Sequence, residues 1–344
     1  MFENQLSNRR LSPVSAYLAV TSACPYNCWH CSLKNRRAGH LDTAQWLDII
    51  AQLHEVGCSV MGFTGGEPLC RQDLPQLIEA ASRGGAETIL YTCGAMINDE
   101  WIERLKQAGL WSICVSYDHP DPAMFDQKRG KPGAAQAAEQ AIRLSARHGF
   151  YTMIGSVATR EFVAEKHYKL LLNKAKSMGV HEFRIVEPMP CGKLSQASRD
   201  TFLTADMIQE LRDFHVRANK RLGGPKVCAF NQIESPELFG CGGGTQHMFI
   251  DPAGEVTPCD FTPLSFGNLR EEKLKVVWLR MVEAMGGAPR RHCFIQKNHQ
   301  LIDKHGNGHT FPLPQAVSQT ICAEAGQEEL PDYFQMLLSA KQKP

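Results

Sequence analysis

Short apolar runs alternate along residues 16–190 with segments whose apolar side chains recur at helical spacing, most of which end at a glycine. The runs predict strands at 16–21, 60–64, 88–92, 111–116, 151–157 and 182–186, and the segments predict helices at about 43–56, 74–82, 99–107, 134–147 and 164–177. This alternation favours right-handed strand–helix–strand units and a parallel sheet. No G-x-G-x-x-G follows the first strand, which weighs against a dinucleotide-binding fold. The pattern therefore predicts an α/β protein with a partial (β/α)6, TIM-like barrel.

The first predicted strand leads directly into a loop that contains Cys24, Cys28 and Cys31. Three residues separate the first pair and two separate the second, so the three thiolates can turn toward one metal site. Soft thiolate ligands select iron–sulfur clusters, zinc or copper(I). A cubane cluster has four irons, so three cysteines leave one iron open for chemistry. Half of a zinc site, or a chance grouping in a chain with 13 cysteines, is the alternative.

Glycines and polar residues follow three other predicted strands, at the ends where barrel enzymes place their chemistry. After the second strand, two glycines allow the backbone to approach a ligand closely, although an ordinary turn would use them too. An arginine beyond the fourth strand could pair with a carboxylate ligand through two hydrogen bonds, or lie solvated on the surface. The candidate site residues at these strand ends are Gly65, Gly66, Glu67, Pro68, Thr92, Gly94, Ser116, Asp118 and Arg129.

These sequences together resemble the radical SAM family over about residues 14–190. The cysteine loop is similar to its C-x3-C-x2-C motif, residues 65–68 to its Gly-Gly-Glu-Pro motif, and residues 116–118 to its Ser-x-Asp, whereas Cys93 stands where the family usually has asparagine. The resemblance implies a [4Fe–4S] cluster on the three loop cysteines, with S-adenosylmethionine (SAM) on the open iron. It also implies that the glycine-rich backbone receives the SAM amino group, that Asp118 and Arg129 lie near its carboxylate or ribose, and that the backbone of His30 meets the adenine.

The alternation ends at a Gly-Gly-Pro sequence, so the chain is expected to divide into a barrel domain, 1–225, and a second domain, 226–344. An Asp-Pro-Ala-Gly sequence between apolar residues predicts a β-hairpin, whose ends would bring Cys241 and Cys259 together. With a tryptophan-bearing helix and further cysteines, this part resembles the twitch or SPASM extension of radical SAM enzymes. The resemblance implies one auxiliary iron–sulfur cluster, of the [4Fe–4S] type. Its candidate ligands are Cys241, Cys259, Cys293 and Cys322; Cys322 either completes the site or leaves it open for substrate, and a zinc knuckle of these cysteines is the alternative.

The resemblance further implies an enzyme that reductively cleaves SAM to a 5′-deoxyadenosyl radical and abstracts a hydrogen atom, leading to oxidation or rearrangement. A flavodoxin- or ferredoxin-type protein would supply the electron. Cys191, after the sixth strand, would face the cavity and is a candidate hydrogen-atom donor. No leader-binding segment is visible before the first strand, so a small-molecule substrate is expected, with a precursor peptide or protein as the second candidate. A non-catalytic iron–sulfur electron carrier is the third.

Charge and hydropathy limit the partners that the chain is expected to need. Its formal net charge is +1, which gives no reason to expect nucleic acid or an anionic membrane as a partner. No apolar run is long enough for a membrane span and no signal sequence opens the chain, so a cytoplasmic protein is expected. The cytosol keeps thiols reduced, and the many cysteines therefore favour metal ligation or redox chemistry over disulfides.

Overall fold

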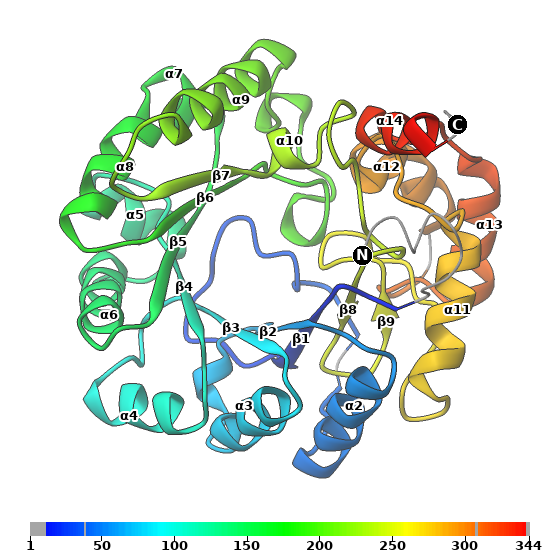
Figure 1. Cartoon of the computed structure of the whole chain (residues 1–344), viewed down its shortest axis with the longest axis horizontal. Helices are drawn as coiled ribbons and strands as arrows, with labels where there is room; N and C mark the ends of the chain where they lie inside the picture. Colours follow the sequence, from blue (N-terminus) through cyan, green and yellow to red (C-terminus); the bar gives the residue numbers. More distant parts are fainter. Residues whose placement is uncertain (1–11, 38, 307–308, 342–344) are drawn as a thin grey trace.

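In the computed structural model, which describes residues 12–37, 39–306 and 309–341, a curved sheet forms the inner layer of the molecule and helices surround it (Figure 1). The nine strands lie in the order β7-β6-β5-β4-β3-β2-β1-β8-β9, and every neighbouring pair is parallel except β8 and β9. The strands are β1 (Ser15–Thr21), β2 (Val60–Gly65), β3 (Glu87–Thr92), β4 (Ser112–Ser116), β5 (Tyr151–Val157), β6 (Glu182–Val186), β7 (Lys226–Ala229), β8 (His247–Ile250) and β9 (Val256–Thr257). The predicted α/β barrel-like architecture is confirmed.

The barrel helices follow the strands in turn, and their ends are fixed by local hydrogen bonds. Asp42 and Gln45 form a capping box at the first of them, and Asn98 caps α4. The expected helix at 164–177 is wrong in one respect, because Lys166 adopts a left-handed conformation (φ 57°) and a new helix begins after it. The helices are α2 (Thr43–Glu55), α3 (Leu74–Arg83), α4 (Asp99–Gln107), α5 (Pro122–Arg129), α6 (Ala134–Arg147), α7 (Arg160–Ala164), α8 (His167–Ser177), α9 (Ala205–Asn219) and α10 (Phe230–Ile233).

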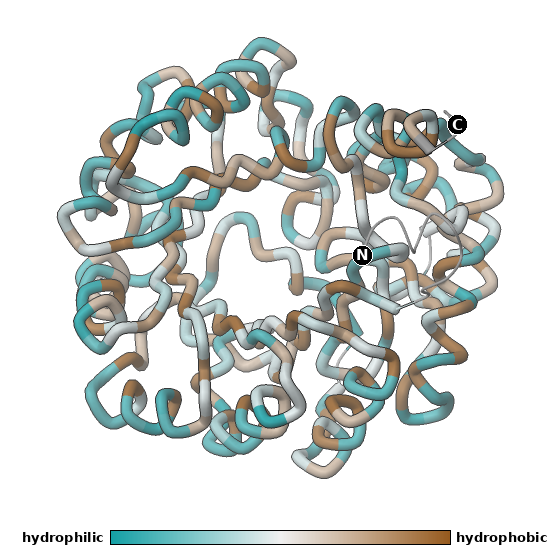
Figure 2. Tube along the Cα trace, viewed as in Figure 1, coloured by the Kyte–Doolittle hydropathy of each residue, from teal (hydrophilic) through white to brown (hydrophobic). Residues whose placement is uncertain are grey.

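The two faces of the sheet differ in polarity. Alternate residues of β1, such as Leu18, belong to the main apolar core under the helices, and hydrophobic residues run along the strands in Figure 2. The other face carries Tyr17 and Tyr91, whose hydroxyl oxygens lie 2.6 Å apart. Arg184 on β6 donates to the Tyr91 hydroxyl at 2.8 Å and pairs with Glu182 at 2.6 Å. Polar groups are therefore tied together inside the barrel, while the apolar contacts hold the helices outside it.

The sheet is open. Among the described residues, no backbone pairing joins β7 to β8 or β9, and the C-terminal helices lie beside this opening (Figure 1). They are α11 (Leu274–Ala284), α12 (Phe294–Gly306), α13 (Gln315–Ala325) and α14 (Asp332–Lys341). Strand β7 begins at Lys226 and pairs in parallel with β6, so the sheet continues past the predicted domain boundary at 225. The boundary itself stays a prediction.

The predicted hairpin is present as β8 and β9, with Ile250 opposite Val256. Its turn is held by Asp251, whose carboxylate accepts hydrogen bonds from the backbone of Ala253 and Glu255. Strand β8 also pairs in parallel with β1, and Ser15 lies opposite His247. The hairpin therefore extends the barrel sheet at the strand that leads into the cysteine loop. Within the described residues, no helix has the length and apolar character to cross a membrane.

Candidate active site

The glycine pair after β2 lies directly against the cysteine loop. Gly66 donates its backbone N–H to the Thr21 carbonyl at 2.7 Å, and Glu67 donates to the Ala23 carbonyl at 2.8 Å. A Cβ on Gly66 would lie 2.2 Å from the Ala23 oxygen, so a larger residue would push the two segments apart. Gly65 has a φ of 128°, which other residues rarely adopt. The two glycines thus fix the start of the loop that carries Cys24, which is exposed.

Glu67 joins the ends of β2 and β3 through a fully buried carboxylate. This group accepts hydrogen bonds from the Thr92 hydroxyl at 2.8 Å, the Cys93 backbone at 2.8 Å and the Leu69 backbone at 3.2 Å. Burial raises the pKa of Glu67, although these hydrogen bonds oppose the shift. Thr92 in turn accepts from the backbone of Gly94 at 2.9 Å. The Glu67 side chain therefore acts as a brace between two strand ends, and the turn beginning at Pro68 follows from it.

Asp118 and Arg129 form a buried ion pair, with 2.5 Å between the guanidinium nitrogen and the carboxylate. Asp118 also accepts from the backbone of Val157 at 3.0 Å, which connects the ends of β4 and β5. Arg129 ends α5 and extends its other nitrogen to 3.6 Å from the Cys28 sulfur. Burial lowers the pKa of Arg129, but the negative charges at Asp118 and Cys28 raise it. The pKa is therefore raised overall. The pair therefore holds the Arg129 guanidinium beside the cysteine loop, and a contact of either residue with SAM stays a prediction. Ser116 lies half-buried just before them.

The cysteine loop packs against the end of α5. Asn27 and Trp29 donate backbone hydrogen bonds to the carbonyls of Arg129 and Lys128, each at 3.1 Å. Burial and the positive charge of Arg129 lower the pKa of His30 to about 4, so its imidazole is neutral at pH 7. Its Nδ1 atom is buried and has no hydrogen-bond partner among the described residues. His30 thus lies in the loop beside Arg129, and a contact between its backbone and a cofactor stays a prediction.

The segment after β6 closes over the cysteine loop from the opposite side of the barrel. Lys193 donates its backbone N–H to the Cys31 carbonyl at 3.0 Å, and its ammonium group bonds the Cys28 carbonyl at 2.8 Å. Cys191 is buried, and its thiol pKa is raised by burial and by the nearby Asp260, Cys259 and Cys31. Cys191 therefore lies between the two groups of cysteines. The sequence singled out Cys191 but gave no signal for Lys193.

Cys241, Cys259 and Cys293 come together in the C-terminal part of the chain. The Cys293 thiol and the backbone N–H groups of Phe294 and Gly243 donate hydrogen bonds to Cys241 and lower its pKa. Burial, Asp260 and Cys241 raise the pKa of Cys259 to about 12. The expected approach of Cys241 and Cys259 is thus present, and Cys293 joins them from the residue before α12.

Cys322 lies on α13 in a different environment. It is 5% exposed, belongs to the apolar core, and its sulfur lies 3.8 Å from that of Met285. Burial raises its pKa to about 12, and Arg290 opposes the shift. Its role as a fourth ligand stays a prediction that no contact with the other three cysteines supports among the described residues.

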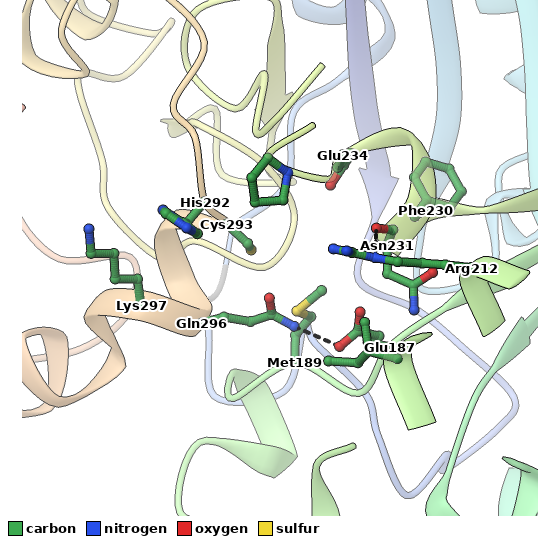
Figure 3. A pocket seen from close by; sticks show the side chains of 12 residues that line it. Glu187, Met189, Arg212, Phe230, Asn231, Glu234, His292, Cys293, Gln296 and Lys297 are labelled. Carbon is green, nitrogen blue, oxygen red and sulfur yellow. Dashed lines mark hydrogen bonds between the residues drawn. The ribbon is translucent and has the colours of Figure 1, made fainter. Parts of the chain in front are cut away.

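A cavity of about 470 Å³ lies where the open side of the barrel meets α12 (Figure 3). Gln296 on α12 reaches across it and donates to Glu187, after β6, at 3.0 Å. Arg212 on α9 donates to the Asn231 carbonyl at 2.9 Å. The side-chain amide of Asn231 lies near Glu187, but within the described chain neither its nitrogen nor its oxygen has a hydrogen bond of good geometry. Cys293 lines the same cavity, which therefore extends to the second group of cysteines.

Two carboxyl groups near this cavity, the exposed Glu234 and the half-buried Asp260, were not predicted from the sequence. The protein surroundings of Glu234, which lines the cavity, and the negative charge at Cys241 raise its pKa to about 8. Asp260 follows Cys259 directly, and burial raises its pKa to about 6 although Arg36 opposes the shift. Arg36 donates to the Asp260 carbonyl at 2.7 Å. The position of Asp260 beside a candidate ligand was a usable signal, whereas nothing in the sequence connected Glu234 or Arg36 to the site.

The two groups of cysteines suit iron–sulfur clusters chemically. Partial desolvation and negative charge at Glu67, Cys28 and Cys31 together raise the pKa of Cys24 to about 11, because like charges at neighbouring groups repel each other. A cation removes this penalty, since it favours the deprotonated ligand. Sulfur donors select soft metals, and three cysteines leave a coordination position open. The loop can therefore hold a cluster with one open iron, and the Cys241 group can hold a second.

Two family models match the chain, one described as "Radical SAM superfamily" over residues 18–169 and one, SPASM, described as "Iron-sulfur cluster-binding domain" over residues 241–301. The PqqA peptide cyclase of Granulibacter bethesdensis is 30% identical over 281 residues, which cover 77% of this chain and 74% of that protein. The AdoMet-dependent heme synthase of Oleidesulfovibrio alaskensis is 26% identical over 294 residues, which cover 78% of this chain and 75% of that protein.

Solved structures share the fold at low sequence identity. Streptococcus suis SuiB bound to the precursor peptide SuiA aligns with a TM-score of 0.64 and 17% identity, covering 80% of this chain and 66% of SuiB. Native anSMEcpe with bound AdoMet and the Cp18Cys peptide aligns with a TM-score of 0.62 and 17% identity, covering 95% of this chain and 98% of that chain. These likenesses support the open parallel sheet and the C-terminal extension described above.

Proposed function

Because this chain belongs to the radical SAM superfamily and carries an iron–sulfur cluster-binding SPASM domain, we propose that it is a maturase that modifies a peptide or protein segment. Its cofactors are SAM and [4Fe–4S] clusters. The small-molecule substrate expected from the sequence has weaker support, because a peptide cyclase is the 30% identical relative. The heme synthase relatives are what favour a small molecule as the second candidate.

Each of the two cysteine groups would hold one iron–sulfur cluster. Cys24, Cys28 and Cys31 would hold the SAM-binding cluster, and Cys241, Cys259 and Cys293 the auxiliary one. When bound, the first cluster and SAM supply a 5′-deoxyadenosyl radical that removes a hydrogen atom from the substrate. Arg129 balances negative charge at the loop, and the backbone of residues 66–67 holds the loop in place.

The side-chain amide of Asn231, which lies near Glu187 without a hydrogen bond of good geometry, is the observation that carries the peptide proposal. A buried amide with poorly aligned partners is costly, and its N–H donors and carbonyl acceptor complement the C=O and N–H groups of a peptide bond. Gln296 adds a second amide to the same cavity, and Cys293 connects the cavity to the auxiliary group. An extended segment bound along the open side of the sheet would satisfy these groups and place its side chain toward the space between the two sets of cysteines.

Two further groups would act on the substrate after hydrogen abstraction. Cys191 lies between the cysteine groups and is the proposed hydrogen-atom donor where the product must be reduced. Asp260 is the proposed proton acceptor where the product is oxidised, because a carboxyl with a pKa of about 6 is largely ionised at pH 7. Only one of these outcomes can apply to a given substrate.

The test uses anaerobically reconstituted protein with SAM and dithionite. Synthetic peptides are made for each short reading frame that neighbours the gene, and mass spectrometry follows peptide mass and 5′-deoxyadenosine together. We expect one peptide to change mass with stoichiometric 5′-deoxyadenosine. The Asn231→Ala variant should raise the peptide KM while leaving peptide-free SAM cleavage unchanged. Turnover that responds only to porphyrin-type or other small molecules would overturn the proposal.

A further inference from the structure

Three ligand-type side chains meet behind the Asp118–Arg129 pair, outside the site described above. His119 lies in the turn between β4 and α5, Glu161 lies on α7, and His167 is the first residue of α8. One nitrogen or oxygen atom from each lies within 4.8 Å of the others. Both histidines are 5% exposed, whereas the Glu161 side chain is 36% exposed. The group is therefore buried on one side and open to solvent on the other.

Each of the three side chains also contacts a partner outside the group. Another nitrogen or oxygen atom of the same side chain faces the other two members. Lys128 holds one oxygen of Glu161 at 2.8 Å, and the other oxygen lies 3.4 Å from Nε2 of His119. The Nδ1 atom of His119 contacts the backbone of Asp121, 3.0 Å from its nitrogen and 3.3 Å from its oxygen. The Nε2 atom of His167 pairs with Glu165 at 3.0 Å. Metal-binding histidines and carboxylates have this kind of outer partner, which fixes the ring and the tautomer.

The hydrogen bonding within the group is incomplete. Nδ1 of His167 is buried and has no hydrogen-bond partner in the part of the chain that the structure describes. The two imidazole rings lie edge to face with their centres 4.5 Å apart, so neither ring satisfies the other through a normal hydrogen bond. Leaving a buried ring nitrogen without a hydrogen-bond partner is unfavourable. A bound cation between the rings would use this nitrogen and remove the penalty.

We propose that His119, Glu161 and His167 bind a divalent transition metal, with zinc as the best match. Two imidazole nitrogens and one carboxylate oxygen form a ligand set that zinc uses with a fourth, open position, here on the solvent side of Glu161. Calcium and magnesium are disfavoured because they prefer oxygen ligands. The metal ties the turn that carries Asp118 to α7 and α8. It therefore stabilises the backbone that positions the Asp118–Arg129 pair.

Zinc content of the holoprotein tests the proposal. The protein is reconstituted with iron and sulfide, so that its cluster cysteines are occupied, then dialysed against buffered zinc and analysed for zinc and iron by mass spectrometry. Wild type is compared with the Glu161→Gln and His167→Gln variants. His148→Gln is the matched control, because His148 also faces a carboxylate, Asp99, but at 3.7 Å on the surface.

We expect about one zinc per chain in wild type and the control, and at least a tenfold weaker affinity in the other two variants. Zinc should also raise the Tm of wild type and not that of Glu161→Gln, since a ligand that binds only the folded state stabilises it. Equal zinc in all four proteins, or none in wild type, would overturn the proposal. So would a Tm that the substitutions lower without any zinc dependence, which is the behaviour of an ion pair alone. Glu161 is at the surface, so its variant remains informative if His167→Gln fails to fold.

Discussion

Gly192 lies so close to Cys31 that a Cβ on the glycine would be 2.2 Å from the Cys31 carbonyl oxygen. Gly192 also has a φ of 55°, a conformation that costs other residues about 1–2 kcal/mol. The next residue, Lys193, donates its backbone N–H to the same carbonyl oxygen. The loop after β6 and the cysteine loop after β1 are thus in contact through their backbones.

The Gly192→Ala variant should therefore bind less iron. The added methyl group must displace the Cys31 backbone, and we expect a loss of about four irons per chain and of 5′-deoxyadenosine formation. Iron and sulfide counting after reconstitution measures the effect. Gly149→Ala is the control, because Gly149 has a φ of 82° but open space around its Cα. Equal iron in both variants would show that the contact is not needed for the cluster.

Asp118→Asn should destabilise the protein strongly. It leaves the Arg129 guanidinium buried beside an amide instead of a carboxylate, and breaking a buried pair in this way costs about 3–5 kcal/mol. Urea unfolding monitored by circular dichroism gives the change in the free energy of unfolding. As a comparison, Arg83→Gln removes the exposed pair with Glu79 and should cost less than about 0.5 kcal/mol. Similar costs for the two variants would contradict the account of the buried pair.

Cys322→Ala should retain the iron of the auxiliary site, whereas Cys259→Ala should lose it. The Cys322 thiol contacts Met285 in the apolar core, so its removal should cost only about 1 kcal/mol of stability. Iron counts on both variants, in a background that lacks the three loop cysteines, isolate the auxiliary cluster. Loss of iron from Cys322→Ala would instead establish it as the fourth ligand.

Glu234 should make stability depend on pH. Its pKa is raised from 4.5 to about 8, so the folded chain keeps a proton that the unfolded chain releases at lower pH. Stability from this group is therefore present below about pH 4.5 and is lost as the pH rises toward 8. Between pH 5.5 and about 8.5, the Tm of Glu234→Gln should fall less than that of wild type. Glu283→Gln, on the exposed face of α11, should follow wild type. Parallel curves for all three would mean that cavity water keeps Glu234 ionised.

Cys191→Ala should separate SAM cleavage from product formation. Cys191 lies between the cysteine groups without being a proposed ligand, so iron content should be unchanged. For a product that needs a hydrogen atom returned, we expect at least about tenfold less product per SAM cleaved. Cys114→Ala, a buried strand cysteine, controls for the loss of a thiol. Normal product yield from the Cys191 variant would remove it from catalysis.

The strands and most helices could be predicted because their signals are local. The predicted strand at 151–157 coincides with β5, and that at 60–64 differs from β2 by one residue. The break at Lys166 was not visible, because the residues around it are ordinary helix formers and only the packing of α7 and α8 requires the turn. Strand β7 was not predicted, because it is only four residues long and its pairing with β6 decides its conformation.

Candidate site residues could be recognised from the sequence where they lie close together along the chain. The three loop cysteines and residues 65–67 lie within single motifs, so the sequence alone could single them out as candidate site residues. No motif contains Asn231, Gln296 or His167. These residues meet the groups around them only because distant segments pack together. The sequence also singled out Glu67, and the structure adds that its carboxylate braces two strand ends, which no motif indicated.

The pairing of β1 with both β2 and β8 has a consequence for the synthesis of the chain. Ser15 and His247 are opposite each other in the sheet but are 232 residues apart in sequence. During synthesis on the ribosome, the edge of β1 that pairs with β8 stays unpaired until β8 emerges. A contact between segments so distant in sequence slows folding. An unpaired edge attracts other strands meanwhile. Expression at lower temperature, or with chaperones that cover exposed strands, should therefore raise the yield of folded protein more than any change to the cysteine loop.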